Sequence, residues 1–172
     1  MNIEKLKYPI GPFEAPKNYS EESLREVITI LDVLPLQLRE LTGNLKGDVL
    51  DTRYRPEGWT IRQVVHHIAD SHQNAFIRFK WALTEDNPTI KAYDEKAWAA
   101  LDDAKITPIA WSLTHIEVIH QKLVQLLNGL TEAQWNRTLV HPHTKHTFTL
   151  KELASMYAWH GMHHFMHIKN AL

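Results

Sequence analysis

Two histidines near the C-terminus have the spacing of metal ligands. His160 and His164 are four residues apart, so on a helix they lie on one face about one turn apart. Imidazole is the commonest protein metal ligand, and two imidazoles at this spacing can reach one ion. Tyr157 and Gly161 lie on the apolar stripe of the same segment. We therefore expect both imidazoles to face inward, near the core.

A metal ion needs at least one more ligand, and a second helical segment carries His66, His67 and His72. On a helical wheel, His72 lies in the middle of the apolar stripe, His67 on one flank and His66 on the other flank, further out. This geometry does not decide between His67 and His72. Because a His pair also arises by chance in a chain with 12 histidines, ordinary hydrogen-bonding roles remain the alternative.

The composition excludes several classes of function. The net charge is −1 and no Lys/Arg block is present, so the electrostatic footprint of nucleic-acid or anionic-membrane binding is missing. The absence of cysteine excludes disulfides, thiolate nucleophiles and Cys-ligated zinc. The first residues form no signal-like apolar run, and no stretch approaches the roughly 20 apolar residues of a membrane span. We expect a cytoplasmic protein that acts on a small molecule, with no nucleic-acid or membrane partner, and leave a homodimer open.

The apolar periodicity predicts four long helices in a single domain covering residues 1–172. Their expected ranges are about 21–41, about 60–84, about 109–128 and from 149 to near the C-terminus. Pro35 should kink or break the first helix. Capping boxes at Thr60-x-x-Gln63 and Thr149-x-x-Glu152 open the second and the last. The fold class that follows is all-α, a four-helix bundle.

The remaining segments predict long connections and short extra helices. Residues 1–19 read as an extended arm over the domain, with no helix. Residues 85–108 form a long connection with a short helix at 93–98, which permits an order other than up-down, and a further short helix is expected at about 131–137. Residues 138–149 read as a loop or small hairpin. Its His141, His143 and His146 are expected in solvent, with a place for one of them at a pocket mouth as the alternative.

Two histidine motifs carry a resemblance to a known family. Residues 58–72, GWTIRQVVHHIADSH, together with residues 157–168, YAWHGMHHFMHI, resemble the DinB-like superfamily. Within it, the chain is similar to the YfiT branch, a group assigned as metal-dependent hydrolases and related to bacillithiol transferases. Residues 8–11, residues 93–98 and the His141-Pro142 pair are also similar to that branch. The resemblance runs nearly from end to end.

The resemblance implies a four-helix bundle that holds one divalent metal ion through His67, His160 and His164. The other histidines of the two motifs would then have structural or supporting roles: His66, His72, His163 and His167. Gly161-Met162 stands where we would expect a more polar pair, which leaves the shape of the pocket open. The ion is expected to be zinc, with nickel as the alternative. No further cofactor is expected.

Three neutral imidazoles would leave a coordination position open, which is typical of catalytic rather than structural zinc. A water bound there would have its pKa lowered to about 7, giving a metal-dependent hydrolase that uses zinc-activated water. Alternatively, the open position could hold a thiolate, giving a low-molecular-weight thiol S-transferase similar to the bacillithiol transferases. A non-catalytic metal-binding stress protein is a third possibility. Catalytic residues beyond the ligands are not identified.

Other catalytic patterns are missing. A ferritin-like two-metal site needs paired Glu-x-x-His motifs, but only Glu117 and His120 form one, and we expect Glu117 to be solvated or supporting. Neither the His-Glu-x-x-His motif of zinc proteases nor a Gly-x-Ser-x-Gly elbow occurs. Tyr157 precedes His160 by about one turn and could line a pocket, although its spacing favours a core role. A metal ion is therefore the only strong activator that the sequence predicts.

Overall fold

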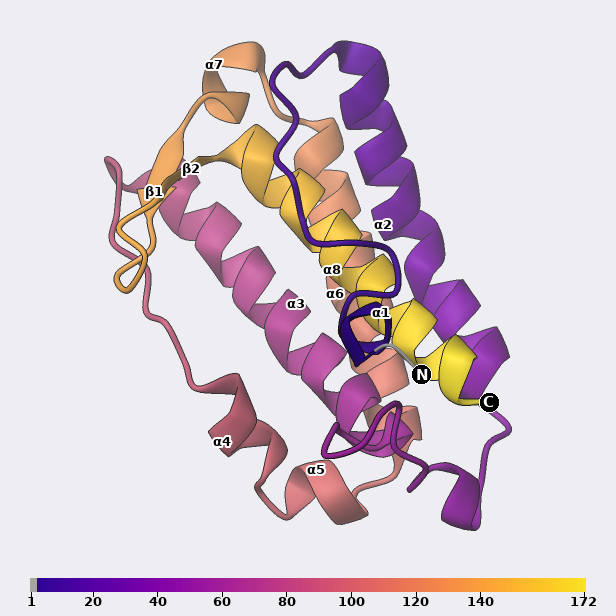
Figure 1. Ribbon diagram of the computed structural model, residues 1–172. Coiled ribbons are helices and arrows are strands. Elements are labelled where there is room, and N and C mark those ends of the chain that lie inside the picture. Colours follow the sequence, from indigo (N-terminus) through magenta and orange to yellow (C-terminus); the bar gives the residue numbers. More distant parts are fainter. Residues whose placement is uncertain (1–2) are drawn as a thin grey trace.

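Four long helices form the body of the protein in the computed structural model, which describes residues 3–172 (Figure 1). They are α2 (Glu21–Thr42), α3 (Ile61–Thr84), α6 (Ile109–Asn128) and α8 (Leu150–Ala171). Both α2 and α3 pack against α6 and α8, so α2 and α3 occupy opposite corners of the bundle. The predicted all-α four-helix bundle is confirmed. Among residues 3–172, no helix is both long and apolar enough to span a lipid bilayer.

The order of the helices departs from a simple up-down bundle. In Figure 1, α3 and α6 run in one direction, and α2 and α8 run in the other. Because α3 and α6 are parallel, residues 85–108 must carry the chain back along the bundle. This connection contains α4 (Glu95–Ala99), close to the short helix expected at 93–98, and α5 (Asp103–Ile106), which was not predicted. The four-residue α5 has no side-chain cap and is too short to show a helical period.

The N-terminal arm contains a short helix, α1 (Ile3–Lys7), so the prediction of an arm without a helix is wrong there. Residues 1–2 lie outside the described residues. The helix ends just before Tyr8-Pro9, where the proline disfavours a helical residue in front of it. The rest of the arm lies over α8 as expected: it crosses α8 in Figure 1, and the Trp159 indole N–H donates to the Gly11 carbonyl at 3.2 Å.

Helix α2 continues through Pro35, so the expected break does not occur. Proline has no N–H, so the carbonyl four residues earlier, that of Leu31, loses its usual helical partner. The imidazole of His120 on α6 fills the gap, with its Nδ1 2.5 Å from the Leu31 oxygen. A side chain from a neighbouring helix thus satisfies the carbonyl that the proline frees.

The predicted helix starts are largely confirmed. Thr60 and Gln63 form the complete capping box of α3. At the start of α8, Thr149 accepts a hydrogen bond from the Glu152 amide, as the predicted box requires, while the Glu152 carboxylate contacts His146 Nε2 at 2.8 Å. The contact between Glu152 and His146 holds the preceding loop against the first turn of α8.

Residues 138–149 form a small hairpin, the second of the two conformations expected for them. Strands β1 (Thr138–Val140) and β2 (Thr147–Thr149) pair antiparallel, with Leu139 opposite Phe148. The hairpin follows the short helix α7 (Glu132–Trp135), which starts at the predicted position. A single 3₁₀ turn (Gly47–Val49) lies in the connection between α2 and α3. Leu139 is buried, so the hairpin is anchored to the bundle.

The hydrophobic core is divided into two clusters. The first includes Leu31, Phe79 and Leu123, and the second includes Leu34, Ile68 and Ile116. Between them in sequence lie two almost fully buried histidines, His72 on α3 and His120 on α6. Buried polar side chains require hydrogen-bond partners, so this polar layer must be internally satisfied. The layer joins the histidines of α8, where the candidate site lies.

Gly161 sets how closely α8 approaches α2. A Cβ atom at this position would lie 2.2 Å from Leu34 Cδ2 and 3.4 Å from His72 Cε1. Leu34 is fully buried, so it has little room to move. Gly161 therefore replaces the expected polar residue for a packing reason.

The substitution Gly161→Ala is expected to destabilise the protein by about 1–3 kcal/mol, the usual cost of overpacking a core. Urea unfolding followed by circular dichroism measures this loss. Gly129→Ala is the matched control, because a Cβ there would meet its nearest atom at 3.6 Å. Equal effects of the two substitutions would contradict this account of Gly161.

Candidate metal centre

Three imidazoles from two helices meet at one point of the bundle. His67 comes from α3, and His160 and His164 come from α8. Their ring centroids are separated by 4.6, 4.8 and 5.2 Å. The Nε2 atoms of His67 and His160 are 3.2 Å apart, and one ligand atom from each of the three residues lies within 4.8 Å of the others. The structure thus brings together the three histidines that the sequence analysis named as ligands.

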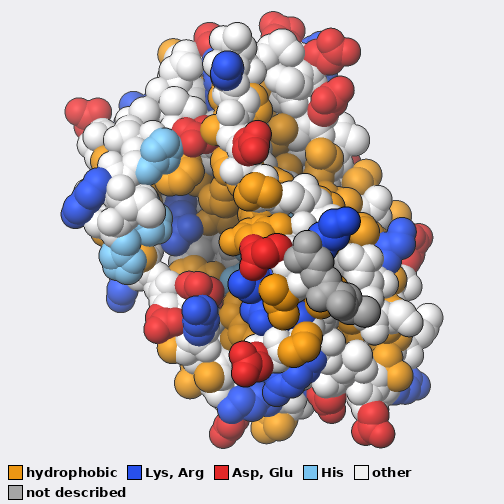
Figure 2. Space-filling view, in the orientation of Figure 1, with side chains coloured by type: hydrophobic (Ala, Val, Ile, Leu, Met, Phe, Trp, Pro, Cys, Tyr) orange, Lys and Arg blue, Asp and Glu red, His pale blue; other side chains and the backbone are white. Residues whose placement is uncertain are grey.

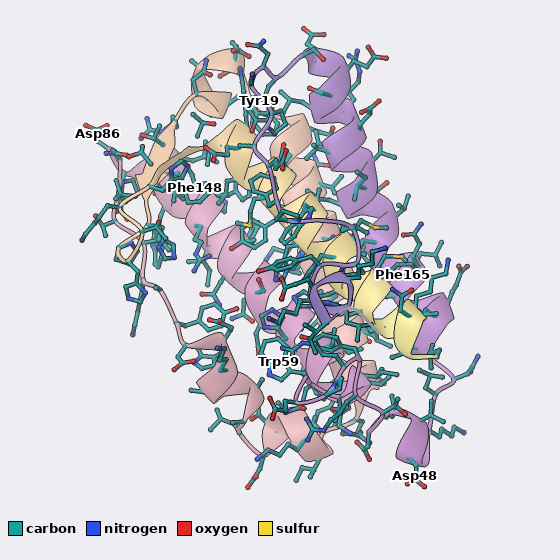
Figure 3. All side chains as sticks on the ribbon, in the orientation of Figure 1. Tyr19, Asp48, Trp59, Asp86, Phe148 and Phe165 are labelled. Carbon is teal, nitrogen blue, oxygen red and sulfur yellow. The ribbon has the colours of Figure 1, made fainter. Side chains whose placement is uncertain are left out.

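The surrounding elements hold these rings in place. Trp59, just before the start of α3, packs on His67 at a centroid distance of 4.7 Å and stacks on His164 at 6.3 Å. Figure 3 labels Trp59 beside the N-terminal half of α3. His67 and His164 are each only 7% exposed. The i, i+4 spacing on α8 supplies two rings, and the packing of α3 against α8 supplies the third.

The donor set fits a divalent ion such as zinc. Two imidazole nitrogens on a tetrahedral zinc ion, with Zn–N bonds of about 2.0–2.1 Å, lie about 3.3 Å apart, close to the observed 3.2 Å. Burial, followed by the nearby His163, lowers the pKa of His67 to about 4. Burial is also the main reason that the pKa values of His160 and His164 lie well below their ordinary value. All three rings are therefore neutral at pH 7, the form that binds metal.

The three imidazoles lie on the wall of a cavity of about 750 Å³, within the size range of small-molecule sites. Figure 2 shows Lys and Arg side chains, in blue, around a hollow on this face of the molecule. Arg55 and Arg78 both line the cavity, and each has a buried Nε with no hydrogen-bond partner among the described residues. The wall is therefore suited to an anionic group on a substrate.

Two phenols also line the cavity. Arg78 Nη1 donates to the Tyr157 hydroxyl at 2.6 Å, and burial raises the pKa of Tyr157. Tyr157 is 1% exposed, so it is both a core residue and part of the cavity wall. Burial likewise raises the pKa of Tyr93 to about 12. Both hydroxyls keep their protons at neutral pH and can donate hydrogen bonds into the cavity.

The histidines of the loop before α8 have different surroundings. His143 and His146 are exposed, as expected. His141 is half-buried and lines the same cavity as the three clustered histidines, so the alternative expected for one loop histidine holds for this one.

Sequence analysis missed the role of His120 in this region. It is 1% exposed, and its Nε2 lies 2.8 Å from His72 Nδ1. The sequence carries a signal for its burial. Position 120 continues the spacing of three and four residues that links the apolar positions 113, 116, 123 and 127, so it lies on the buried face of the helix. Glu117, the other half of the Glu-x-x-His motif, is partly exposed, with 46% of its side chain accessible, and pairs with Arg39 at 2.7 Å. It points to solvent on the outside of the bundle and takes no part in the histidine cluster.

The other motif histidines lie around the three central rings. His72 Nε2 contacts Nδ1 of His160 at 3.2 Å, on the side of that ring away from His67. His163 stacks on Trp159, and His167 contacts His164. His66 instead contacts the Ser112 hydroxyl at 2.7 Å and so ties α3 to α6. The structural or supporting roles expected for these four histidines stay predictions.

The metal-free protein is expected to lose stability as the pH falls below neutrality. The pKa of His67 is 6.5 in the unfolded chain and about 4 in the folded protein. The unfolded state therefore takes up a proton between these values while the folded state does not. The contribution of His67 to the free energy of unfolding is fully present above pH 6.5. It is lost as the pH falls toward 4, and the loss amounts to about 3 kcal/mol for this residue alone. Urea unfolding at pH 7.5, 6 and 5 measures the slope, and a flat profile would contradict the buried neutral ring.

Comparison with known proteins identifies the family to which the chain belongs. The family model described as the DinB superfamily matches residues 31–168. The chain is 42% identical over 168 residues to "Putative metal-dependent hydrolase YfiT" of Bacillus subtilis, covering 98% of this chain and 94% of the relative. It is 46% identical over 166 residues to a Bacillus cereus protein named "Putative metal-dependent hydrolase", covering 96% and 95% of the two chains.

Solved structures show the same relationship. YfiT from Bacillus subtilis, described as having an "unusual four-helix bundle topology", superposes with a TM-score of 0.95 over 97% of this chain and 95% of that one. A mycothiol-dependent maleylpyruvate isomerase superposes with a TM-score of 0.67 at 16% identity, over 84% of this chain and 60% of that one, a likeness of fold alone. The chain belongs to the DinB superfamily and shares its fold with YfiT.

Proposed function

We propose that this protein is a metal-dependent hydrolase in which His67, His160 and His164 bind one divalent ion, zinc by preference and nickel as the alternative. The observation that carries the proposal is the meeting of three buried, neutral imidazoles on the wall of a small-molecule cavity. A divalent ion held there would supply a Lewis acid that lowers the pKa of a bound water or thiol. The names of the relatives support the same activity.

The chain's own residues would position the substrate. The Arg55 and Arg78 side chains line the cavity, and their positively charged guanidinium groups can bind an anionic group. The protonated hydroxyl of Tyr157 can donate a hydrogen bond to a substrate oxygen. Trp59 packs against both His67 and His164 and would help to hold the two rings in place.

Transfer of a low-molecular-weight thiol is the second candidate. Hydrolysis benefits from a carboxylate close to the metal that can accept a proton from water. Among the described residues that line the cavity, the only carboxylates are Glu57 and Glu95, and both are exposed. A thiol is more acidic than water and needs no such base, so this arrangement favours it as an alternative substrate.

A substrate screen tests the proposal. Zinc-loaded and chelator-treated protein are compared on simple esters and amides, and on electrophiles offered together with small thiols. We expect activity in one set, its loss on chelation and its return with added zinc. Hydrolysis of esters or amides without added thiol supports the hydrolase, and strict dependence on thiol supports the transferase. Full activity in metal-free protein would contradict both.

A further inference from the structure

A line of hydrogen-bonded rings leads away from His160 through the core. His160 Nδ1 contacts His72 Nε2 at 3.2 Å, and His72 Nδ1 contacts His120 Nε2 at 2.8 Å. The line ends at the Leu31 carbonyl, 2.5 Å from His120 Nδ1. It crosses the bundle from α8 through α3 and α6 to α2, within the polar layer that separates the two hydrophobic clusters.

The carbonyl at the end of this line determines the positions of the protons. A carbonyl only accepts, so His120 Nδ1 must carry a hydrogen, and its neutral ring then has a lone pair on Nε2. His72 must therefore donate from Nδ1 and accept at Nε2, which obliges His160 to donate from Nδ1. The lone pair of His160 is left on Nε2, the atom that faces His67. Because Pro35 removes the helical partner of the Leu31 carbonyl, that carbonyl needs this donor.

His164 lies at the end of a second, shorter line. His167 Nε2 is 3.1 Å from the Lys7 carbonyl, and its Nδ1 is 3.3 Å from His164 Nδ1. The same reasoning places a hydrogen on His167 Nε2, which donates to the carbonyl, and a lone pair on His167 Nδ1. His164 must then donate from Nδ1, which leaves its lone pair on Nε2. The carbonyl belongs to the last residue of α1, so the N-terminal arm contributes to the site.

We propose that these two histidine lines, each anchored on a main-chain carbonyl, fix the tautomers of His160 and His164 so that both direct an Nε2 lone pair at the metal. His72, His120 and His167 are therefore positioning residues. The inference rests on the proposed metal site. Its physical basis is general: the hydrogen bond made by one ring nitrogen decides whether the other can bind a metal.

The two lines also exclude a second ion. His163, His164 and His167 form another group whose ligand atoms lie within 4.8 Å of one another, and it shares His164 with the first group. A neutral imidazole has one lone pair. Because the line through His167 assigns that lone pair of His164 to Nε2, Nδ1 is not free for another ion. One metal per chain follows.

Tautomers in the metal-free protein give the first test. Long-range ¹H–¹⁵N spectra of protein labelled with ¹⁵N at histidine distinguish a protonated from an unprotonated ring nitrogen. We expect hydrogen on Nδ1 of His72, His120, His160 and His164, and on Nε2 of His167. Hydrogen on Nε2 of His160 or His164 would overturn the proposal. The spectra are recorded without metal, so they decide it even if the protein binds none.

Substitution of His120, which does not touch the three proposed ligands, gives the second test. Glutamine can donate its amide N–H to the Leu31 carbonyl and accept from His72 Nδ1 through its oxygen, whereas leucine fills the space and does neither. We expect His120→Leu to weaken zinc binding about 10–100-fold, the usual effect of losing a partner of a ligand. His120→Gln should stay close to the wild type. Competition against a chromophoric chelator measures both affinities.

The pair of variants separates positioning from folding. A folded His120→Leu protein that binds zinc as tightly as the wild type would overturn the role of the line. So would an equal loss in the Gln and Leu variants, because only one of them interrupts the hydrogen bonds. If His120→Leu does not fold, the Gln variant and the tautomer spectra still decide. Wild-type protein that shows the expected tautomers but binds no zinc would sink the proposed function and leave the two lines standing.

Discussion

Replacement of His67 by alanine is expected to abolish stoichiometric zinc binding. The residue supplies the only one of the three proposed ligands that comes from α3, so its loss leaves two imidazoles on one helix. The effect should exceed the roughly 100-fold loss that removal of a supporting partner causes. Alanine at position 160 or 164 should have the same result. Metal analysis of purified variants after dialysis against one equivalent of zinc measures the loss.

His66→Ala is the matched control for this experiment. His66 is adjacent in sequence and also 7% exposed, but its ring contacts Ser112 and the Thr107 carbonyl instead of the cluster. It should keep most of the metal, as should His163→Ala. His72→Ala should weaken binding without abolishing it. Full metal loss in His72→Ala together with none in His67→Ala would show that the third ligand is His72 and that its assignment to His67 is wrong.

Removal of the metal is expected to lower the melting temperature without unfolding the bundle. The proposed ligands His67 and His160 are 93 residues apart, so the ion ties α3 to α8. Binding to the native state alone stabilises it by about 2.7 kcal/mol when free zinc is at 100 times the dissociation constant. For a domain of this size, the corresponding change is roughly 5–10 °C. Thermal melts with zinc and with chelator measure it.

The helices should persist in chelator because both hydrophobic clusters remain packed. The circular dichroism spectrum at 25 °C is therefore expected to be the same with and without metal. Loss of the helical signal on chelation would instead mark a structural ion and would argue against an open catalytic site. The Gly161→Ala variant provides a comparison, since it should lower stability by a similar amount in the presence and absence of zinc.

Much of the helical framework could be predicted because its signals are local. The capping box at Thr60 fixes the start of α3, and apolar periodicity together with the glycine at position 129 predicts the bounds of α6. The break that the sequence allowed at Pro35 does not occur, because His120, 85 positions away in sequence, satisfies the carbonyl that the proline frees. Such a compensation is visible only when α2 and α6 are packed together.

For the candidate site, too, local spacing predicted the two ligands on α8, whereas the third ligand depends on how α3 and α8 pack together. The spacing of His160 and His164 identified one face of one helix, but the wheel left His67 and His72 as alternatives. Both contact His160, one at Nε2 and the other at Nδ1, so both were plausible for a physical reason. The choice depends on which nitrogen of His160 faces which ring, and the lines that decide it end at two carbonyls that no residue pattern reveals.

The most direct test of the central claim is the position of the metal in a crystal of this protein grown with one equivalent of zinc. An anomalous difference map at the zinc edge locates the ion and the nitrogens that bind it. We predict a single peak per chain, bonded to Nε2 of His67, His160 and His164. A peak bonded to Nδ1 of His164 and His167, or no peak at the cluster, would contradict the proposed site.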